Sequence, residues 1–328
     1  MQVEAIVFTG PGGPEVITVG TTPLRRPGPG EVVVEVVAAG LNRADVLQRR
    51  GLYPAPTGTV ADVPGLELSG RVAERGPGAQ LFAVGAEVMA VVAGGAMARQ
   101  IVVHERELMP VPHGVDLIEA AAIPEAFLTA WDALGQADLR AGEVVLIHAA
   151  ASGVGCAALQ LAAALGADAL ATSRHAAKLD RLTQLGLRHR PIVVTEARFA
   201  AEVSALTGGA GAAVILDCVG AAYLEENVRA LARGGRMVLI GTLGGGTGSL
   251  PLTMLLGKRA TLIGTVLRSR PLEEKITLAR AGAQRLVPMF ERGLLRPIID
   301  QVLPMTDLAA AHARMEADAN VGKLVLRW

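Results

Sequence analysis

The sequence is poor in cysteine, and this excludes several kinds of protein. Only Cys156 and Cys218 occur among 328 residues, too few for the disulfide framework of a secreted domain. The first residues, Met1 to Ile6, also lack the basic start and apolar core of a secretory signal. We therefore expect a cytoplasmic protein.

The sequence also lacks an excess of either charge and any long hydrophobic run. Lys and Arg together number 31, as do Asp and Glu together, so the formal net charge is zero. Nucleic acid and acidic membrane surfaces are therefore poor partners. Apolar runs are interrupted, for example by Gln160, Gly166 and Asp168, and none reaches the ~20 residues that span a bilayer. We expect an enzyme without nucleic-acid partner or membrane insertion.

The most informative stretch runs from Gly142 to Thr172. Val144 to Ile147 form an uninterrupted apolar run, which is typical of a strand covered on both faces by helices. Small residues follow from Ala149 to Gly155, and an apolar pattern at near-helical spacing comes after them. A helix that starts there directs its free N–H groups and its positive dipole end toward a phosphate.

This turn predicts dinucleotide binding in a degenerate form. Ala150, Ser152 and Gly155 stand where the G-x-G-x-x-G motif has its glycines. The alternative is a plain strand–helix–strand crossover whose small residues serve only close packing. Further strands are expected at 169–172, 213–216 and 236–240, and turns with glycine follow the last two. Such turns form the crevice where an open α/β sheet binds its ligand, so we expect a doubly wound parallel sheet.

Residues 1–120 contain short strand-like segments separated by turns, as in a β-rich domain. Strands are expected at 31–38, with a break at Gly40, and at 70–74, 87–92 and 99–103, which suggests a partly closed barrel or a sandwich. A helix with an Asn cap is expected over 42–51, before the loop that carries Tyr53. The chain is long enough for two domains, and a strand-like tail at 322–326 suggests that the last ~60 residues return to the first.

Motifs along almost the whole length resemble one known family. They are Gly12-Gly13-Pro14-Glu15, Leu41-Asn42-Arg43-Ala44-Asp45, Pro64 through Gly70, Ala121 through Glu125, His148 through Gly155, Leu216 through Gly220, Leu267-Arg268-Ser269-Arg270 and Asn320-Val321-Gly322-Lys323. The sequence resembles the zinc-independent quinone oxidoreductases of the medium-chain dehydrogenase/reductase superfamily, most closely the tumour-suppressor-inducible branch. The resemblance implies an α/β protein with a β-rich GroES-like catalytic domain over 1–124 and 268–328. It also implies a Rossmann-type domain over 125–267, with NADPH in the cleft between the two.

Zinc-dependent relatives of this family bind catalytic zinc through a Cys and a His at the positions of Asn42 and Leu66. An amide and an alkyl group cannot replace a thiolate and an imidazole. The lobe of four cysteines that binds structural zinc is missing as well, since 88–103 contains no Cys. We expect a metal-free enzyme whose acceptor takes a hydride without a Lewis acid. A quinone suits such a site, and so does an alkene conjugated to a carbonyl.

The resemblance assigns active-site roles to Asn42, Asp45 and Tyr53. For Asn42 and Asp45 the alternative is a helix N-cap with a first-turn acid. Tyr53 is one of only 2 tyrosines, and we expect it to stack on a flat acceptor from a loop stiffened by Pro54 and Pro56. The alternative for Tyr53 is a surface aromatic.

The cofactor-binding residues that we expect lie mainly after the predicted strand ends. They are Tyr53, Thr129, Ala151, Ser152, Gly153, Val154, Gly155, Ser173, Arg174, Lys178, Cys218, Gly220, Gly241, Leu243, Gly244, Gly245, Gly246, Leu267, Ser269 and Lys323. For Thr129 the alternative is a helix-surface hydroxyl, and for 244–246 a flexible surface turn. Cys218 has no base beside it and is not expected to be a nucleophile. His148 is expected to be a buried, hydrogen-bonded core residue.

The end of the second predicted strand favours NADPH over NADH. NAD-specific domains have an Asp or Glu there, which binds the ribose 2′-hydroxyl and repels a 2′-phosphate. This sequence has Thr172-Ser173-Arg174 and then Lys178, which offer a hydroxyl and two positive charges. Relatives carry a Tyr near the position of Val193 that helps to hold the phosphate, so part of the discrimination is expected to be lost.

The function that we expect is reduction of a quinone by NADPH. Reduction of enones, alkenals or acryloyl-type thioesters is the main rival among enzymes, and a nonenzymatic, crystallin-like NADPH-binding protein is a rival of another class. The resemblance also implies a homodimer joined through the Rossmann-type domains. Apolar stretches at 237–240 and 261–266 are its expected interface, and the alternative for 261–266 is a covered internal strand.

Overall fold

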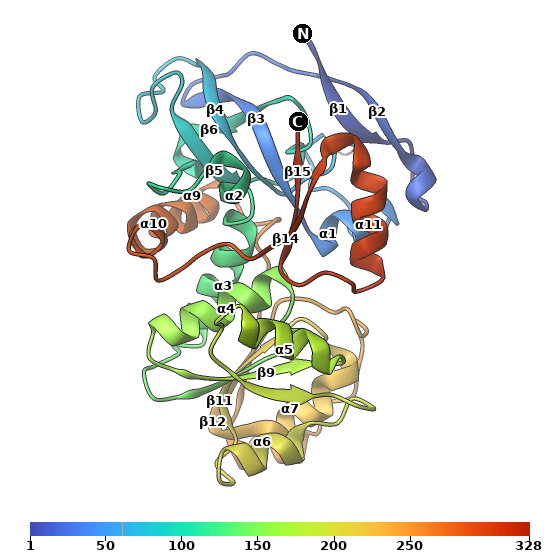
Figure 1. Cartoon of the computed structure of the whole chain (residues 1–328), viewed down its shortest axis with the longest axis vertical. Coiled ribbons are helices and arrows are strands. Elements are labelled where there is room, and N and C mark those ends of the chain that lie inside the picture. The colour runs from blue at the N-terminus through green and yellow to red at the C-terminus, as the bar shows by residue number, and fades with distance from the viewer. Residues whose placement is uncertain (61) are drawn as a thin grey trace. The chain divides into compact units, whose positions relative to one another are not determined.

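The computed structural model describes residues 1–60 and 62–328, which form two compact units (Figure 1). Unit 1 comprises Met1–Leu128 and Leu267–Trp328, and unit 2 comprises Thr129–Val266. The predicted domain boundaries, 1–124 with 268–328 and 125–267, lie close to the limits of these units. As the limits of independently folding domains they stay a prediction.

Unit 2 is a six-stranded parallel sheet whose strands are joined through helices. The strands occur in the order β10-β9-β8-β11-β12-β13, which is the Rossmann order, and every pairing is parallel. The elements are α3 (Pro124–Gln136, shared with unit 1), β8 (Val144–Ile147), α4 (Gly153–Ala164), β9 (Asp168–Ser173), α5 (Ala176–Gln184), β10 (Arg190–Val193), α6 (Ala200–Leu206), β11 (Ala212–Asp217), α7 (Leu224–Ala230), β12 (Leu231–Leu239), α8 (Leu252–Lys258) and β13 (Thr261–Gly264). The sequence therefore predicted this sheet correctly.

The burial of the strands explains their apolar sequences. Val145, Leu146 and Ile147 of β8 have no exposed surface, because β8 lies between β9 and β11 in the middle of the sheet. β13 is an edge strand, as one of the two predictions for 261–266 had it. The other apolar stretch, 237–240, was wrongly assigned to a dimer interface: Met237 and Val238 are buried in β12, which β11 and β13 flank.

Gly155 lets α4 begin close to β8. A Cβ atom at this position would lie 2.5 Å from the carbonyl oxygen of Ala150 and 2.6 Å from that of Ala149. These atoms are backbone, so they cannot move aside as a flexible side chain would. The last glycine of the degenerate motif is thus required by packing.

Unit 1 contains a seven-stranded sheet built around the long strand β3 (Glu31–Leu41). The order is β14-β15-β3-β4-β5-β7, and β6 also pairs with β3. The other strands are β4 (Glu67–Arg75), β5 (Glu87–Val91), β6 (Gln100–His104), β7 (Met109–Pro110), β14 (Ile299–Pro304) and β15 (Lys323–Arg327), and β1 (Gln2–Phe8) pairs with β2 (Ile17–Pro23) in a sheet of their own. The tail strand predicted at 322–326 is β15, which Figure 1 shows in red beside β3 in blue.

The helices of unit 1 are short. They are α1 (Arg43–Arg49), α2 (Leu117–Ala120), α9 (Leu272–Ala281), α10 (Val287–Glu291) and α11 (Leu308–Glu316). α1 starts after Asn42, as predicted, and α11 packs on the apolar face of the sheet through Leu308 and Ala311. Over residues 1–60 and 62–328, no helix has the length and apolar character needed to cross a membrane.

The predicted break of β3 at Gly40 is wrong, because Gly40 is required there by packing and does not end the strand. β3 continues to Leu41, and a Cβ atom on Gly40 would collide with the carboxylate of Glu67 and lie 2.6 Å from the carbonyl oxygen of Ala121. Glycine here does not end a strand. It makes room for a buried carboxylate against the backbone.

Replacing Gly155 by Ala should push α4 away from β8. We expect the free energy of unfolding to fall by on the order of 1–3 kcal/mol, because the backbone must shift to admit the methyl group. Urea unfolding measures this. Gly135→Ala in α3 is the control, since a Cβ atom there would meet nothing within 4 Å apart from its chain neighbours and the backbone of its own helix. It should change stability by no more than about 1 kcal/mol. Equal effects of the two substitutions would contradict the packing argument.

Candidate functional site

The predicted dinucleotide turn joins β8 to α4. Ser152 occupies the N-cap of α4, and its Oγ accepts a hydrogen bond from the Gly155 N–H at 3.0 Å. Gly153 and Val154 form the first turn of the helix, at the carboxyl end of β8. A 12-residue helix that begins at this point favours a phosphate at its N-terminus.

Ser173, Arg174 and Lys178 follow the carboxyl end of the neighbouring strand β9. The Ser173 Oγ accepts a hydrogen bond from the His175 N–H at 3.1 Å, whereas the Arg174 side chain is exposed. Lys178, in the first turn of α5, lies close enough to Cys156 of α4 to act on its thiol electrostatically. The positive charges therefore border the same edge of the sheet as the turn. Val193 lies in register beside Ser173 on β10 and is 40% exposed.

The loops after β11 and β12 are tied to each other. The N–H groups of Leu243 and Gly244 donate to the carbonyls of Cys218 and Val219 at 3.2 and 2.7 Å, and the Ala221 N–H donates to Gly245 at 3.0 Å. The glycine loop is thus anchored to the loop 218–221, which argues against a flexible surface turn. Cys218, Gly220, Gly241 and Leu243 to Gly246 come together in this way.

A buried hydrogen-bond chain links three of these strand ends. Asp217 accepts from the N–H groups of Val219 at 2.6 Å and Gly220 at 3.2 Å, and from the Asn227 side chain at 3.0 Å. The Asn227 Oδ1 lies 2.6 Å from His148 Nε2, and His148 Nδ1 lies 2.9 Å from the Thr172 hydroxyl. The chain fixes the loop after β11 relative to the end of β9.

The protonation of this chain follows from its burial. Burial lowers the pKa of His148 to about 4, so the imidazole is neutral at pH 7. Burial raises the pKa of Asp217 to about 6, although its hydrogen bonds oppose the shift. His148 is the buried, hydrogen-bonded core histidine that the sequence predicted. The roles of Asp217 and Asn227 were missed, because nothing local in the sequence shows that they meet.

Unit 1 holds a second polar cluster, centred on the Glu67 carboxylate at the start of β4. Glu67 Oε1 accepts from the Asn42 amide at 2.9 Å and from the Lys323 ammonium, and Oε2 accepts from the Glu125 N–H at 2.8 Å. The side chains of Glu67 and Lys323 are 0% and 5% exposed. Lys323 also donates to Asn42 Oδ1 and to the Leu41 carbonyl, both at 2.8 Å.

Asp45 lies fully buried beside this cluster. Its carboxylate accepts from the backbone N–H groups of Asn42 at 2.8 Å and Gly65 at 3.0 Å, so it stabilises the start of α1. Burial raises the pKa of Asp45 to about 6, while Lys323 and Arg268 oppose the shift. The structure thus confirms Asp45 as a first-turn acid of α1, whereas an active-site role for Asn42 and Asp45 stays a prediction.

Glu125, at the start of α3, is the third acid of this cluster. Its side chain keeps some solvent exposure, yet burial and the Glu67 carboxylate raise the pKa of Glu125 to about 8. Glu125 is therefore protonated at pH 7. Glu67 and Glu125 stand in the family motifs of the sequence, but no local pattern there indicates a role for either.

Tyr53 packs on a buried arginine. The Arg268 guanidinium lies 5.1 Å from the centre of the Tyr53 ring and donates to the Tyr53 carbonyl at 3.3 Å, the Gln48 side chain at 2.5 Å and the Ala93 carbonyl at 2.7 Å. Burial raises the pKa of the Tyr53 phenol. The half-buried ring is thus held in place, which favours a site role over a loose surface aromatic.

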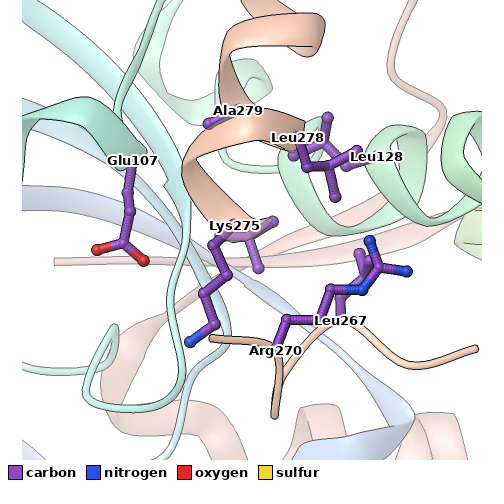
Figure 2. Close-up of a pocket in the computed structure, with 8 residues that line it drawn as sticks. Glu107, Leu128, Leu267, Arg270, Lys275, Leu278 and Ala279 are labelled. Atoms are coloured by element: carbon purple, nitrogen blue, oxygen red, sulfur yellow. The ribbon is translucent and has the colours of Figure 1, made fainter. Parts of the chain in front are cut away.

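Of the other predicted cofactor residues, Thr129 is half-buried in α3, Ser269 is exposed, and Leu267 lines a cavity in unit 1. Figure 2 shows this cavity with Glu107, Lys275 and Arg270 around it. Its volume is about 20 Å³, which suits a water molecule and not an aromatic ring. Leu267 therefore borders a small cavity of unit 1, and its contact with a cofactor stays a prediction.

The residues at the positions of the zinc ligands do not suit a metal. The side-chain oxygen of Asn42, Oδ1, accepts a hydrogen bond from the Lys323 ammonium, and Leu66 is a buried alkyl side chain. Across the described residues no three His, Cys, Asp or Glu side chains are grouped as metal ligands. The donor set of unit 1 therefore does not fit zinc.

Two family descriptions match the chain, one within unit 1 and one that begins in unit 2 and extends into α9 of unit 1. Residues 28–113 match the alcohol dehydrogenase GroES-like domain, and residues 153–281 match the zinc-binding dehydrogenase family. These segments contain most of the sheet of unit 1 and the strands β9 to β13 of unit 2.

The similar proteins carry different names: a quinone oxidoreductase, a polyketide synthase system protein and an enoyl reductase. The chain is 34% identical over 335 residues to a quinone oxidoreductase of Pseudomonas aeruginosa, with 99% of both chains covered. It is 36% identical over 313 residues to the spectinabilin polyketide synthase system protein NorB of Streptomyces orinoci, covering 91% of this chain and only 13% of that protein. Among solved structures, the JamJ enoyl reductase in its apo form matches with a TM-score of 0.89 and 27% identity, covering 100% and 99% of the chains.

Replacing Lys323 by Met should strongly destabilise the protein, because Glu67 would keep a buried charge without its cation. We expect the free energy of unfolding to fall by about 3–5 kcal/mol, measured by urea unfolding. The control is Arg71→Met, which removes a pair with Glu87 whose side chains are 51% and 45% exposed, and it should cost less than about 1 kcal/mol. Similar losses in both variants would show that Glu67 does not depend on Lys323.

Proposed function

Because the chain belongs to the medium-chain dehydrogenase/reductase superfamily, we propose that it is an NADPH-dependent quinone oxidoreductase. The observation that carries this proposal is the polar centre of unit 1. Lys323 and Arg268 are its cations, and Asn42 and Leu66 replace ligands that would hold zinc. A quinone is electron-poor enough to accept a hydride without a Lewis acid, so it matches this centre.

The residues of unit 2 fit a bound dinucleotide. NADPH supplies the hydride when bound. Gly153 and Val154 would direct their backbone N–H groups at its pyrophosphate, and Arg174 and Lys178 would bind the 2′-phosphate. The anchored loops 218–221 and 241–246 border the rest of the cofactor. In unit 1, Tyr53 stacks on the flat acceptor, and the network of Asn42, Glu67 and Lys323 keeps the polar centre rigid.

A second candidate function is reduction of an enone or an acryloyl-type thioester. It is favoured by the likeness to the NorB synthase and to the JamJ enoyl reductase. Three further predictions belong to the same proposal: membership in the tumour-suppressor-inducible branch, a homodimer through β13 and a cytoplasmic location. A nonenzymatic role would contradict the proposal. An assay of NADPH oxidation with a panel of quinones, enones and acryloyl thioesters distinguishes these functions. We expect quinones to give the highest kcat/KM.

Replacing Arg174 by Ala should weaken NADPH binding by about tenfold and leave NADH binding unchanged. The reason is that the variant loses a charge-assisted contact to the 2′-phosphate, a group that NADH lacks. Titration of nicotinamide fluorescence gives both dissociation constants. Arg181→Ala, an exposed arginine on the same helix–loop segment, is the control and should behave as the wild type. An Arg174 variant with wild-type NADPH affinity would refute the assignment.

Replacing Tyr53 by Ala should lower kcat/KM for quinones several-fold with little change in NADPH affinity. The aromatic contact contributes about 1 kcal/mol, and the cofactor binds elsewhere. Tyr53→Phe keeps the ring on Arg268 and separates stacking from the hydroxyl, so it should retain most of the activity. Loss of NADPH binding in the Ala variant would instead make Tyr53 a cofactor or structural residue, and no change at all would make it a bystander.

A further inference from the structure

The polar centre of unit 1 contains three acids with different surroundings. Glu67 is fully buried and bonded to Asn42, Lys323 and a backbone N–H. Asp45 is fully buried and bonded to two backbone N–H groups. Both therefore hold their charge in fixed hydrogen bonds and have no free face to offer to a ligand.

Glu125 differs from both. Its backbone N–H is bonded to Glu67, but within the described residues its carboxyl group makes no hydrogen bond to any protein group, and its side chain keeps some exposure. It lies close enough to Tyr53 for the two groups to influence each other electrostatically. Among the residues that the structure describes, Glu125 is thus the one acid of this centre whose carboxyl group has no hydrogen-bond partner in the protein and stays open to a ligand.

Burial is the main reason why the pKa of Glu125 is raised, and the charges that face Glu125 act in both directions. Glu67 on β4 and Asp45 on α1 repel a negative charge there, while Lys323 on β15 and Arg268 attract it. The two cations are already engaged, Lys323 with Glu67 and Arg268 with Gln48 and two carbonyls. A third negative charge would have no cation of its own, and burial adds to the cost.

We propose that Glu125 is the proton donor of the reaction, and that its carboxylic acid protonates the acceptor oxygen on which negative charge develops. This rests on the proposed function. A hydride with its two electrons passes from NADPH to the quinone, which leaves NADP⁺ and a hydroquinone anion. The O–H bond of Glu125 breaks as a new O–H bond forms on that anion, which gives the hydroquinone. The Glu125 carboxylate then takes a proton from water.

A positioned acid stabilises the developing oxyanion during hydride transfer, which water in bulk does less well. The same acid would serve an enone, whose reduction also builds charge on a carbonyl oxygen.

The test compares the wild type with Glu125→Gln, using 1,4-naphthoquinone as the acceptor and NADPH as the donor. Wild-type kcat/KM should be flat at neutral pH and fall as the pH rises through about 8, because the acid must be protonated. The Gln variant should be about 100-fold slower at pH 7 and lack this fall, since a general acid contributes at least that much. The two profiles should therefore converge at high pH.

Controls separate a chemical role from a structural one. NADPH affinity and the melting temperature should be the same in the wild type and Glu125→Gln, and Glu119→Gln, an exposed acid on α2, should keep the wild-type rate and profile. Infrared difference spectra of the wild type against Glu125→Gln should show a protonated carboxylic acid band at neutral pH that disappears above pH 8.

Three results would overturn the proposal. One is a Gln variant with the wild-type rate and the same fall at high pH. Another is a Gln variant that loses NADPH affinity or thermal stability in proportion to its rate, which would make Glu125 structural. The third is a wild type that oxidises NADPH with neither 1,4-naphthoquinone nor an enone, which refutes the proposed function and this step with it. An active wild type with an unchanged Gln variant refutes the proton donor alone.

Discussion

The Glu67–Lys323 ion pair is the interaction on which unit 1 depends. Its two charges are almost completely buried, and their hydrogen bonds join the end of β3, the start of α1, the start of β4, the start of α3 and the last strand, β15. A buried pair of this kind contributes little net stability compared with apolar residues, but removing one partner is costly. The pair therefore fixes the arrangement of these segments, and it adds little to the free energy of unfolding. Gly40 is part of the same arrangement, because only a residue without a side chain leaves room for the Glu67 carboxylate.

The surroundings of this pair decide the protonation of the other acids. Two cations balance two carboxylates, and every further negative charge in the centre meets repulsion and poor solvation. The same physics works in unit 2, where His148 stays neutral and Asn227 joins it to Asp217. The two clusters differ in how completely their side chains are hydrogen-bonded. The network in unit 2 holds loops in place, whereas the centre in unit 1 leaves the Glu125 carboxyl without a hydrogen-bond partner among residues 1–60 and 62–328.

Much of the fold could be predicted because its signals are local. The apolar run of β8, the small residues after it and the glycines at strand ends lie within a few residues of one another, and the order of the strands follows from the α/β alternation. The clusters could not be predicted in this way, because Lys323 and Glu67 are 256 residues apart. Gly40 shows the same limit: the sequence marks a glycine, but whether it ends a strand or admits a carboxylate depends on Glu67. The stretch 237–240 was misjudged because apolar residues suit a buried strand and an interface equally well.

The pairing of β15 with β3 has a consequence for the order in which the chain acquires structure during synthesis. Unit 2 is one continuous segment, so all strands of its sheet are present once residue 266 has been made. Unit 1 must wait, because Leu324 pairs with Leu41 and Lys323 with Glu67 only when the end of the chain arrives. Until then β3 has an open edge from Ala38 to Leu41, and open strand edges invite pairing with other chains. On the ribosome, the middle of this protein is expected to fold before its beginning.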